Sequence, residues 1–274
     1  MCKVLNVSRS GYYKWKGRPE SNQARQHREW TDQVKEVYDQ SRKLYGSPKV
    51  AEKLRQQGVA ISTRTVTRIM NKQQWRSRTV KKHKATTNSK HNLPVQENVL
   101  NQEFTASKPN EKWVTDITYI GTEEGWLYLA SVMDLYSRKI VGWHMSDRMT
   151  KELVLAALRQ AHGRQQPDGK VLHHSDRGSQ YASHDYQKQL KAYDMIGSMS
   201  RKGNCYDNAC IESFHSIIKK ELIYLNKYET RAEAEKSIFE YIEVFYNNER
   251  IHSSLGYATP SYFEQQHHFN TVNQ

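Results

Sequence analysis

The sequence lacks the features of membrane, secreted and zinc-knuckle proteins. No apolar run approaches the roughly 20 residues that cross a bilayer, and the N-terminus has no apolar signal segment. Cysteine is scarce, with Cys2, Cys205 and Cys210 as the three cysteines among 274 residues and no CxxC spacing. This odd, scattered set argues against a disulfide framework or a zinc knuckle. We therefore expect a protein of a reducing cytoplasm with no membrane partner.

Apolar residues are also few, and basic charge is concentrated in one part of the chain. Hydrophobic residues make up 36% of the sequence, and the formal net charge is +13. Residues 1–110 hold 23 Lys+Arg against 8 Asp+Glu, whereas residues 111–274 hold 19 against 21. The excess therefore lies entirely in the first 110 residues. This asymmetry predicts a polyanion-binding region ahead of a separately folded core.

The basic part begins with two predicted segments. Residues 1–25 form a basic N-terminal segment, in which residues 7–10 resemble the turn and second-helix start of a helix-turn-helix. An ordinary basic amphipathic terminus is the alternative. Residues 26–76 show three helical patterns, and we expect Ser47 and Ser62 to cap the second and third.

The third of these helices is predicted to enter the major groove of DNA. Basic residues recur on it and just beyond it, at Arg64, Arg68, Lys72, Arg76 and Arg78. A three-helix bundle with a solvated basic face is the alternative. Residues 77–110 lack periodicity and predict an extended basic linker, in which Lys81 and Lys82 would follow the phosphate backbone.

From residue 111 the pattern becomes that of a sheet protein. The stretch WVTDITYI alternates as a strand does, and two further strands follow it. The predicted order is strand, strand, strand, helix, strand, helix, strand, helix. This order favours an α/β fold with a mixed five-stranded sheet and helices on both faces, the ribonuclease H-like plan, over residues 111–225. Residues 226–274 are expected to form a helix, Thr230 to Phe245, and a tail packing on the core.

Three carboxylates occupy special places in this plan. Asp116 lies midway along the first strand, Asp176 ends the fourth, and Glu212 lies on the first turn of the last core helix. The first and fourth strands are neighbours in the plan, and the last helix passes over the same edge. Taken singly, each acid has an ordinary alternative: an ion pair, a turn, or a favourable helix dipole. Together they predict a carboxylate cluster.

A cluster of this kind predicts divalent cations. Carboxylates with phosphate oxygens suit Mg²⁺ or Mn²⁺. Two such ions, about 3.5–4 Å apart, activate a water or 3′-hydroxyl and stabilise the leaving oxygen. We therefore expect Asp116, Asp176 and Glu212 to be catalytic ligands of two ions. Lys219, two turns after Glu212, is predicted to reach a phosphate from the same helix face.

Other polar residues near these positions are weaker candidates. Arg177 follows Asp176 directly, and Asn208 lies in the loop before the last core helix; both are candidate DNA contacts. For Asn208 the alternative is a structural role in the loop or helix cap. Gly178 and Tyr181 are as easily structural as substrate-binding.

The spacing of the acids is itself distinctive, with 35 residues between Asp176 and Glu212. Longer motifs surround them: WVTDITYI, HHSDRGSQYAS, SMSRKGNCYDNACIESFHSIIKKE and NNERIHSSLGYATPSYFE. These stretches resemble the insertion-sequence-three transposase family in its second-frame (OrfB) product, which has a retroviral-integrase-like catalytic core. The earlier stretch YGSPKVAEKLRQQGVAISTRTVTRIM is similar to that family's helix-turn-helix. Two departures are Cys205, where proline is more frequent, and the absence of an integrase-type zinc-binding HHCC domain.

The resemblance implies a bacterial, nucleoid-associated DNA transposase that cuts and joins the ends of its own element. Its expected partners are the terminal inverted repeats, target DNA and a first-frame (OrfA) product, fused or separate. Because both ends must be brought together, we also expect a homo-oligomer on DNA. The alternatives are a ribonuclease H-like nuclease that only hydrolyses, and a non-catalytic DNA-binding regulator.

Overall fold

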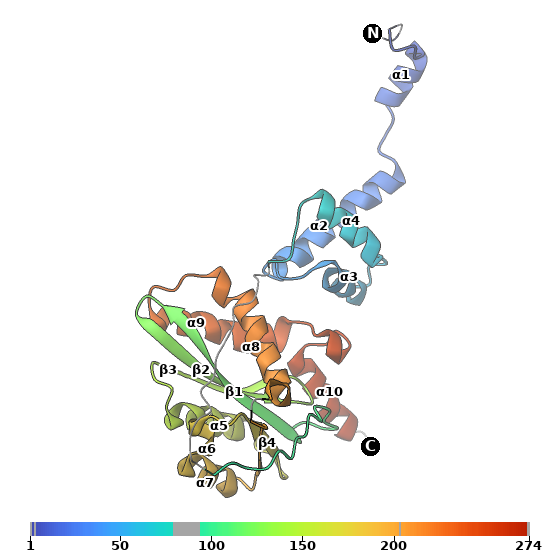
Figure 1. The fold of residues 1–274 in the computed structure, drawn as a ribbon. Helices are drawn as coiled ribbons and strands as arrows, with labels where there is room; N and C mark the ends of the chain where they lie inside the picture. Colours follow the sequence, from blue (N-terminus) through green and yellow to red (C-terminus); the bar gives the residue numbers. More distant parts are fainter. Residues whose placement is uncertain (1, 3, 79–93, 203, 273–274) are drawn as a thin grey trace. The chain divides into compact units, whose positions relative to one another are not determined.

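The computed structural model describes residues 2, 4–78, 94–202 and 204–272, and the chain divides into two compact units, Met1–Ser77 and Arg78–Gln274 (Figure 1). No helix in these described ranges is long and apolar enough to cross a membrane.

The first unit consists of helices. They are α1 (Arg9–Lys16), α2 (Asn22–Gln40), α3 (Ser47–Gln56) and α4 (Thr63–Lys72). Helices α2, α3 and α4 contact one another around a small apolar core formed by Val34, Val37, Val50, Leu54, Val66 and Ile69. Helix α1 buries no residue. The three predicted helices of residues 26–76 are therefore present.

The starts of α3 and α4 test the two predicted serine caps. Ser62 caps α4, because its hydroxyl accepts a hydrogen bond from the backbone N–H of Thr65 at 3.1 Å. The prediction for Ser47 is wrong: Ser47 is already helical, and Gly46 is the N-cap. The hydroxyl of Ser47 instead accepts a hydrogen bond from Thr67 of α4 at 2.9 Å. The hydroxyl oxygen of Ser47, predicted to cap α3, thus forms a contact between α3 and α4 instead.

The second unit is built on one mixed sheet of five strands. These are β1 (Lys112–Thr122), β2 (Gly125–Asp134), β3 (Ile140–Ser146), β4 (Leu172–Ser175) and β5 (Ile196–Met199). Their spatial order is β3-β2-β1-β4-β5. Strands β1, β2 and β3 pair antiparallel, whereas β4 runs parallel to both β1 and β5. The predicted adjacency of the first and fourth strands is confirmed.

Helices cover both faces of the sheet (Figure 1). One face packs on α5 (Lys151–Gln165), α6 (Ser179–Ala182) and α7 (His184–Ala192), through a core that includes Ala130 and Val132 of β2. Ser131, between them, meets His215 of α8 (Ala209–Glu221) on the other face. Successive residues of a strand point to opposite faces, so β2 separates the two helical layers.

Part of the expected linker is attached to the sheet. The backbone N–H groups of Val99 and Leu100 both donate to the hydroxyl of Ser198 in β5, at 2.9 and 3.1 Å. The side chain of Gln96 bonds Gln187 of α7, and Leu100 is buried. This stretch is therefore packed against the core and does not follow the expected extended course. Lys81 and Lys82 lie outside the described residues.

The C-terminal helix is also more complex than expected. Helix α9 runs over Arg231–Phe239, with Thr230 as its cap, and continues as a π-helical segment over Glu240–Glu249. Helix α10 (Pro260–Val272) follows. Helix α8 ends at Glu221, and Leu225 beyond it is 37% exposed in a short 3₁₀ turn.

The contact between β3 and α5 gives a test of this packing. A Cβ at Gly142 would lie 2.4 Å from the carbonyl oxygen of Ala157 and 2.6 Å from the Cβ of Ala161. We expect Gly142→Ala to destabilise the protein by about 1–3 kcal/mol through overpacking. The control is Gly163→Ala in α5, where nothing lies within 4 Å of the added Cβ; this variant should be neutral or stabilising. Chemical denaturation measures both, and equal stability of the two variants would contradict this packing.

Candidate active site

The sheet brings the two aspartates to one place. In the parallel pair of β1 and β4, Val114 lies opposite His174. Asp116 and Asp176 each lie two residues beyond this pair. Strand β4 ends at Ser175, so its pairing with β1 stops before the two aspartates. A shared register thus puts both carboxylates at the same end of the sheet.

Helix α8 lies against this end through three contacts with β1 and β2. His215 Nδ1 is 3.4 Å from Asp116 Oδ2, and His215 Nε2 is 3.4 Å from the hydroxyl of Ser131. Just before the helix, the amide of Asn208 donates to the carbonyl of Thr115 at 2.9 Å. Glu212 lies three residues before His215, about one helical turn. Its side chain is exposed at the start of the helix.

Asp116 and Glu212 influence Asp176 electrostatically. Burial, together with the negative charges of Asp116 and Glu212, raises the pKa of Asp176 to about 7, although the backbone N–H of Gly178 opposes the shift. That N–H donates to Asp176 Oδ1 at 2.9 Å. Asp116 and Glu212 are thus near enough to Asp176 for their charges to act on its carboxyl group, and the predicted cluster of three metal ligands stays a prediction.

The donor set suits a hard divalent cation, because carboxylate oxygens are the preferred ligands of Mg²⁺ and Mn²⁺. The negative charges of Asp116 and Glu212, which add to burial in raising the pKa of Asp176, would be offset by positive charge between the acids. Within the described ranges, no three His, Cys, Asp or Glu side chains are already arranged to hold an ion together.

Gly178 and Tyr181 support Asp176 and the strand beside it. A Cβ at Gly178 would lie 3.0 Å from Asp176 Oδ1, so any side chain there would press on the carboxylate. Tyr181 is buried, and its hydroxyl lies 3.3 Å from that of Thr115. Both observations favour the structural alternative for these two residues.

Lys219 lies near the acids on the same helix. Its ammonium is 4.3 Å from the ring centroid of Tyr119. Burial lowers the pKa of Lys219, while the negative charge of Asp116 partly restores it. The exposed rings of Tyr119 and Trp126 meet edge to face at 5.1 Å beside this lysine. A phosphate contact of Lys219 remains a prediction.

The other candidate DNA contacts differ in their surroundings. The basic side chains of Arg64, Arg68 and Lys72 are exposed at four-residue spacing on α4, opposite its buried face. Arg76 is exposed too, and its carbonyl accepts a hydrogen bond from Tyr38.

Arg177 and Asn208 both contact the core. Arg177 Nε donates to the carbonyl of Ser200 at 2.6 Å. Asn208 is 3% exposed and bonded to β1, which argues against the predicted DNA contact and for a structural role. Its side chain does not cap α8 either.

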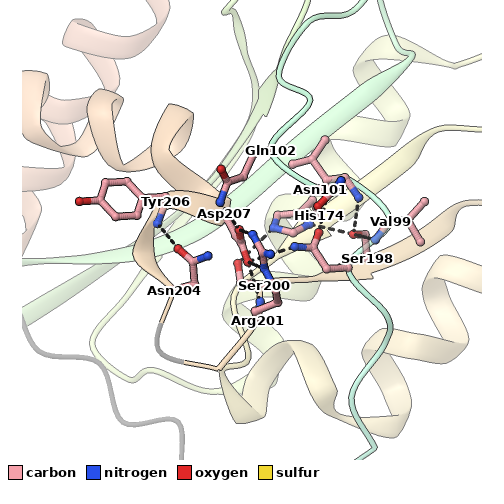
Figure 2. Close-up of polar contacts among 12 residues, drawn as sticks. Val99, Asn101, Gln102, His174, Ser198, Ser200, Arg201, Asn204, Tyr206 and Asp207 are labelled. Atoms are coloured by element: carbon pink, nitrogen blue, oxygen red, sulfur yellow. Dashed lines mark hydrogen bonds and ion pairs between the residues drawn. The ribbon is translucent and has the colours of Figure 1, made fainter.

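Sequence reasoning missed a cluster beside this site. Asp207 is fully buried and bonded to Arg201, Asn98 and Gln102 (Figure 2). His174 lies nearby, with its two ring nitrogens 2.8 and 3.1 Å from the hydroxyls of Ser198 and Ser200. The partners of Asp207 in residues 98–102 lie over 100 positions away in the chain and leave no local signal in the sequence.

Comparison with known proteins assigns this chain to a family. Residues 106–205 and residues 194–260 match two family descriptions of the integrase core domain, and residues 26–83 match that of an HTH-like domain. The chain is 44% identical over 268 residues to the transposase InsF of insertion sequence IS3A from Escherichia coli K12. That alignment covers 97% of this chain and 93% of the relative. The chain belongs to the IS3 transposase family.

A second relative covers the chain equally well. A 31 kDa protein of insertion element IS600 from Shigella sonnei is 42% identical, over 98% of each chain. Among solved structures, the HTLV-2 integrase catalytic core in complex with magnesium is 16% identical, covering 58% of this chain and 99% of its own, with a TM-score of 0.45. The BIV integrase core is 17% identical with the same TM-score, covering 60% and 99%. The family assignment rests on the transposases and not on these structures.

The raised pKa of Asp176 predicts how pH changes the stability of this transposase without divalent cations. A carboxyl group whose pKa is raised by folding costs no stability below its unfolded value, about 3.9. The cost grows as the pH rises toward the folded value of about 7. We therefore expect Asp176→Asn to raise the melting temperature over wild type more at pH 8 than at pH 5, in the presence of a chelator.

The matched control is Asp185→Asn. The side chain of Asp185 is exposed, and its hydrogen bond with Lys151 lowers its pKa, so this variant should gain nothing as the pH rises. A melting-temperature difference between Asp176→Asn and wild type that is the same at both pH values would contradict the repulsion described here.

Proposed function

We propose that this transposase cuts and joins the ends of its insertion sequence with Asp116, Asp176 and Glu212 as catalytic, metal-binding residues. The observation that carries the proposal is that the negative charges of Asp116 on β1 and Glu212 on the first turn of α8 both act on the buried carboxyl group of Asp176, directly after β4. Two Mg²⁺ or Mn²⁺ ions are the proposed cofactors.

The chain's own residues would prepare this site for DNA. Asp116, Asp176 and Glu212 would hold the ions, which when bound supply Lewis-acid activation of the attacking hydroxyl and the leaving oxygen. The N–H of Gly178 orients Asp176, and His215 is placed to orient Asp116. Lys219, close to Asp116, would bind a phosphate oxygen and hold the scissile strand.

The first unit would recognise the element ends. Helix α4 presents a row of basic side chains to solvent, while its other face is buried, as a groove-reading helix requires. Arg64 and Arg68 would read base edges, whereas Lys72 and Arg76 would bind phosphates. Lys81, Lys82 and Arg177 remain proposed backbone contacts.

Assembly follows from the reaction. Both ends of an element must be held together, so we propose an oligomer of at least two copies on the inverted repeats, with target DNA joining the same complex. A first-frame (OrfA) partner, fused or separate, is part of this proposal, as is action on DNA of the bacterial nucleoid.

The catalytic roles can be tested by isosteric amides. We expect Asp116→Asn, Asp176→Asn and Glu212→Gln each to abolish cation-dependent cleavage and joining, because each removes one ligand charge with little change of shape. Binding to element ends should stay close to that of wild type. Labelled element ends with Mg²⁺ report both reactions.

Asp147→Asn, an exposed change after β3, is the matched control and should join ends normally. Full strand joining by any of the three amide variants would remove that residue from the site. Cleavage by wild type without joining would indicate a nuclease, and binding without chemistry would indicate a regulator.

The DNA-reading role of α4 makes a separate prediction. Arg64→Ala or Arg68→Ala should lower the preference for element ends over random DNA by about 1–3 kcal/mol, because a base contact is lost. Lys35→Ala, an exposed change of equal charge on α2, should leave that preference unchanged. Competition binding at fixed salt concentration measures both. Unchanged preference in the two arginine variants would remove α4 from base recognition.

A further inference from the structure

A buried carboxylate connects two distant segments next to the proposed active site. Asp207 has no exposed surface and lies in the 3₁₀ turn Cys205–Asn208, directly before α8. It accepts hydrogen bonds from both the loop after β5 and the segment before β1 (Figure 2).

The first group of bonds closes the loop on itself. Arg201 donates to Asp207 from its backbone N–H at 2.8 Å, from Nε at 3.1 Å and from Nη2 at 2.8 Å. These bonds with Arg201, together with one from Gln102, keep the pKa of Asp207 well below its usual range despite burial. Asp207 is therefore ionised at neutral pH, and its charge is matched by one arginine.

The second group fixes the loop to the segment Asn98–Gln102. Asn98 Nδ2 donates to Asp207 Oδ2 at 3.0 Å, and Gln102 Nε2 donates to Oδ1 at 2.8 Å. This segment is itself held on β5, because Val99 and Leu100 donate to Ser198. The loop is thus bonded to a part of the chain that is anchored independently.

The residues that follow Asp207 connect the loop to the proposed catalytic acids. Asn208, adjacent to Asp207, is bonded to the carbonyl of Thr115, the residue before Asp116. Helix α8 begins at Ala209, and Glu212 lies on its first turn. The position of Glu212 relative to Asp116 therefore depends on where residues 207 and 208 are held.

We propose that Asp207 is a positioning residue, which binds the loop 200–208 to the segment Asn98–Gln102 and so sets Glu212 against Asp116. This rests on the proposed catalytic role of Glu212. It gives the side chains of Asn98 and Gln102, which precede β1, a role in the geometry of the catalytic acids. Small displacements of a catalytic group are costly: about 1 Å can reduce a rate on the order of 100-fold.

Gln102 offers a test that leaves the acids untouched. Its side chain is exposed and lies 110 positions before Glu212. Gln102→Glu keeps the shape but places a carboxylate where an N–H donor faced Asp207, so two negative charges meet. We expect the full-length variant to join ends at least about 10-fold more slowly. Amide hydrogen exchange in residues 200–208 should be faster, while end binding stays at the wild-type level.

Asn101→Asp is the matched control. It adds the same charge to the same segment, and both positions have left-handed backbones, with φ of 44° and 63°. In the structure, Asp207 receives its bonds from Asn98 and Gln102 on either side of Asn101. This variant should match wild type in joining rate and in exchange. Asp207→Asn should reproduce Gln102→Glu in both measurements, because a neutral amide cannot replace the charge that faces Arg201.

Each outcome decides the proposal. Equal slowing by Gln102→Glu and Asn101→Asp would mean that charge acts on the DNA directly, and would overturn it. Unchanged exchange in residues 200–208 of Gln102→Glu would overturn it too, whatever the joining rate. If wild type joins no ends, the proposed catalytic function fails, while exchange still decides whether Asp207 holds the loop.

Discussion

Repulsion among three acids is the constraint on which the rest of this structure depends. Asp116, Asp176 and Glu212 come from separate elements, and burial, together with the negative charges of Asp116 and Glu212, raises the pKa of Asp176 to about 7. A fold gains nothing in stability from such an arrangement, because burial and the neighbouring negative charges both disfavour ionisation of Asp176. It is maintained by the β1–β4 register and by the contacts of α8 with β1. Strain of this kind is characteristic of sites that bind cations and do chemistry.

The two halves of the chain serve different needs of one reaction. The first unit has a small apolar core and an outward row of basic side chains, which suits reading and holding DNA. The second unit has a large core around its sheet, which can hold unfavourable charge in a fixed place. Within the second unit, residues 98–102 bond to β5 and to Asp207, so the segment that precedes β1 also contributes to the end of the sheet where the acids lie.

Local patterns in the sequence predict those structural features that depend on residues close together in the chain. The strand at WVTDITYI, the Ser62 cap and the place of Glu212 on the first turn of α8 all follow from short-range chemistry and are confirmed. The meeting of Asp116 with Asp176 also follows, once the strand order is assigned, because adjacent parallel strands end at one edge. The sequence does not reveal contacts between segments that lie far apart in the chain. Ser47 bonds Thr67 instead of capping its helix, residues 96–102 pack on the core, and the amide of Asn208 turns inward to Thr115.

The central claim is that Asp116, Asp176 and Glu212 hold the divalent cations of the joining reaction. The most direct test is a crystal structure of the transposase with element-end DNA and Mn²⁺, located by its anomalous scattering. The account predicts manganese peaks in contact with all three carboxylates and with the phosphate at the element end. Peaks elsewhere, or none at this cluster in crystals that still join ends, would contradict it.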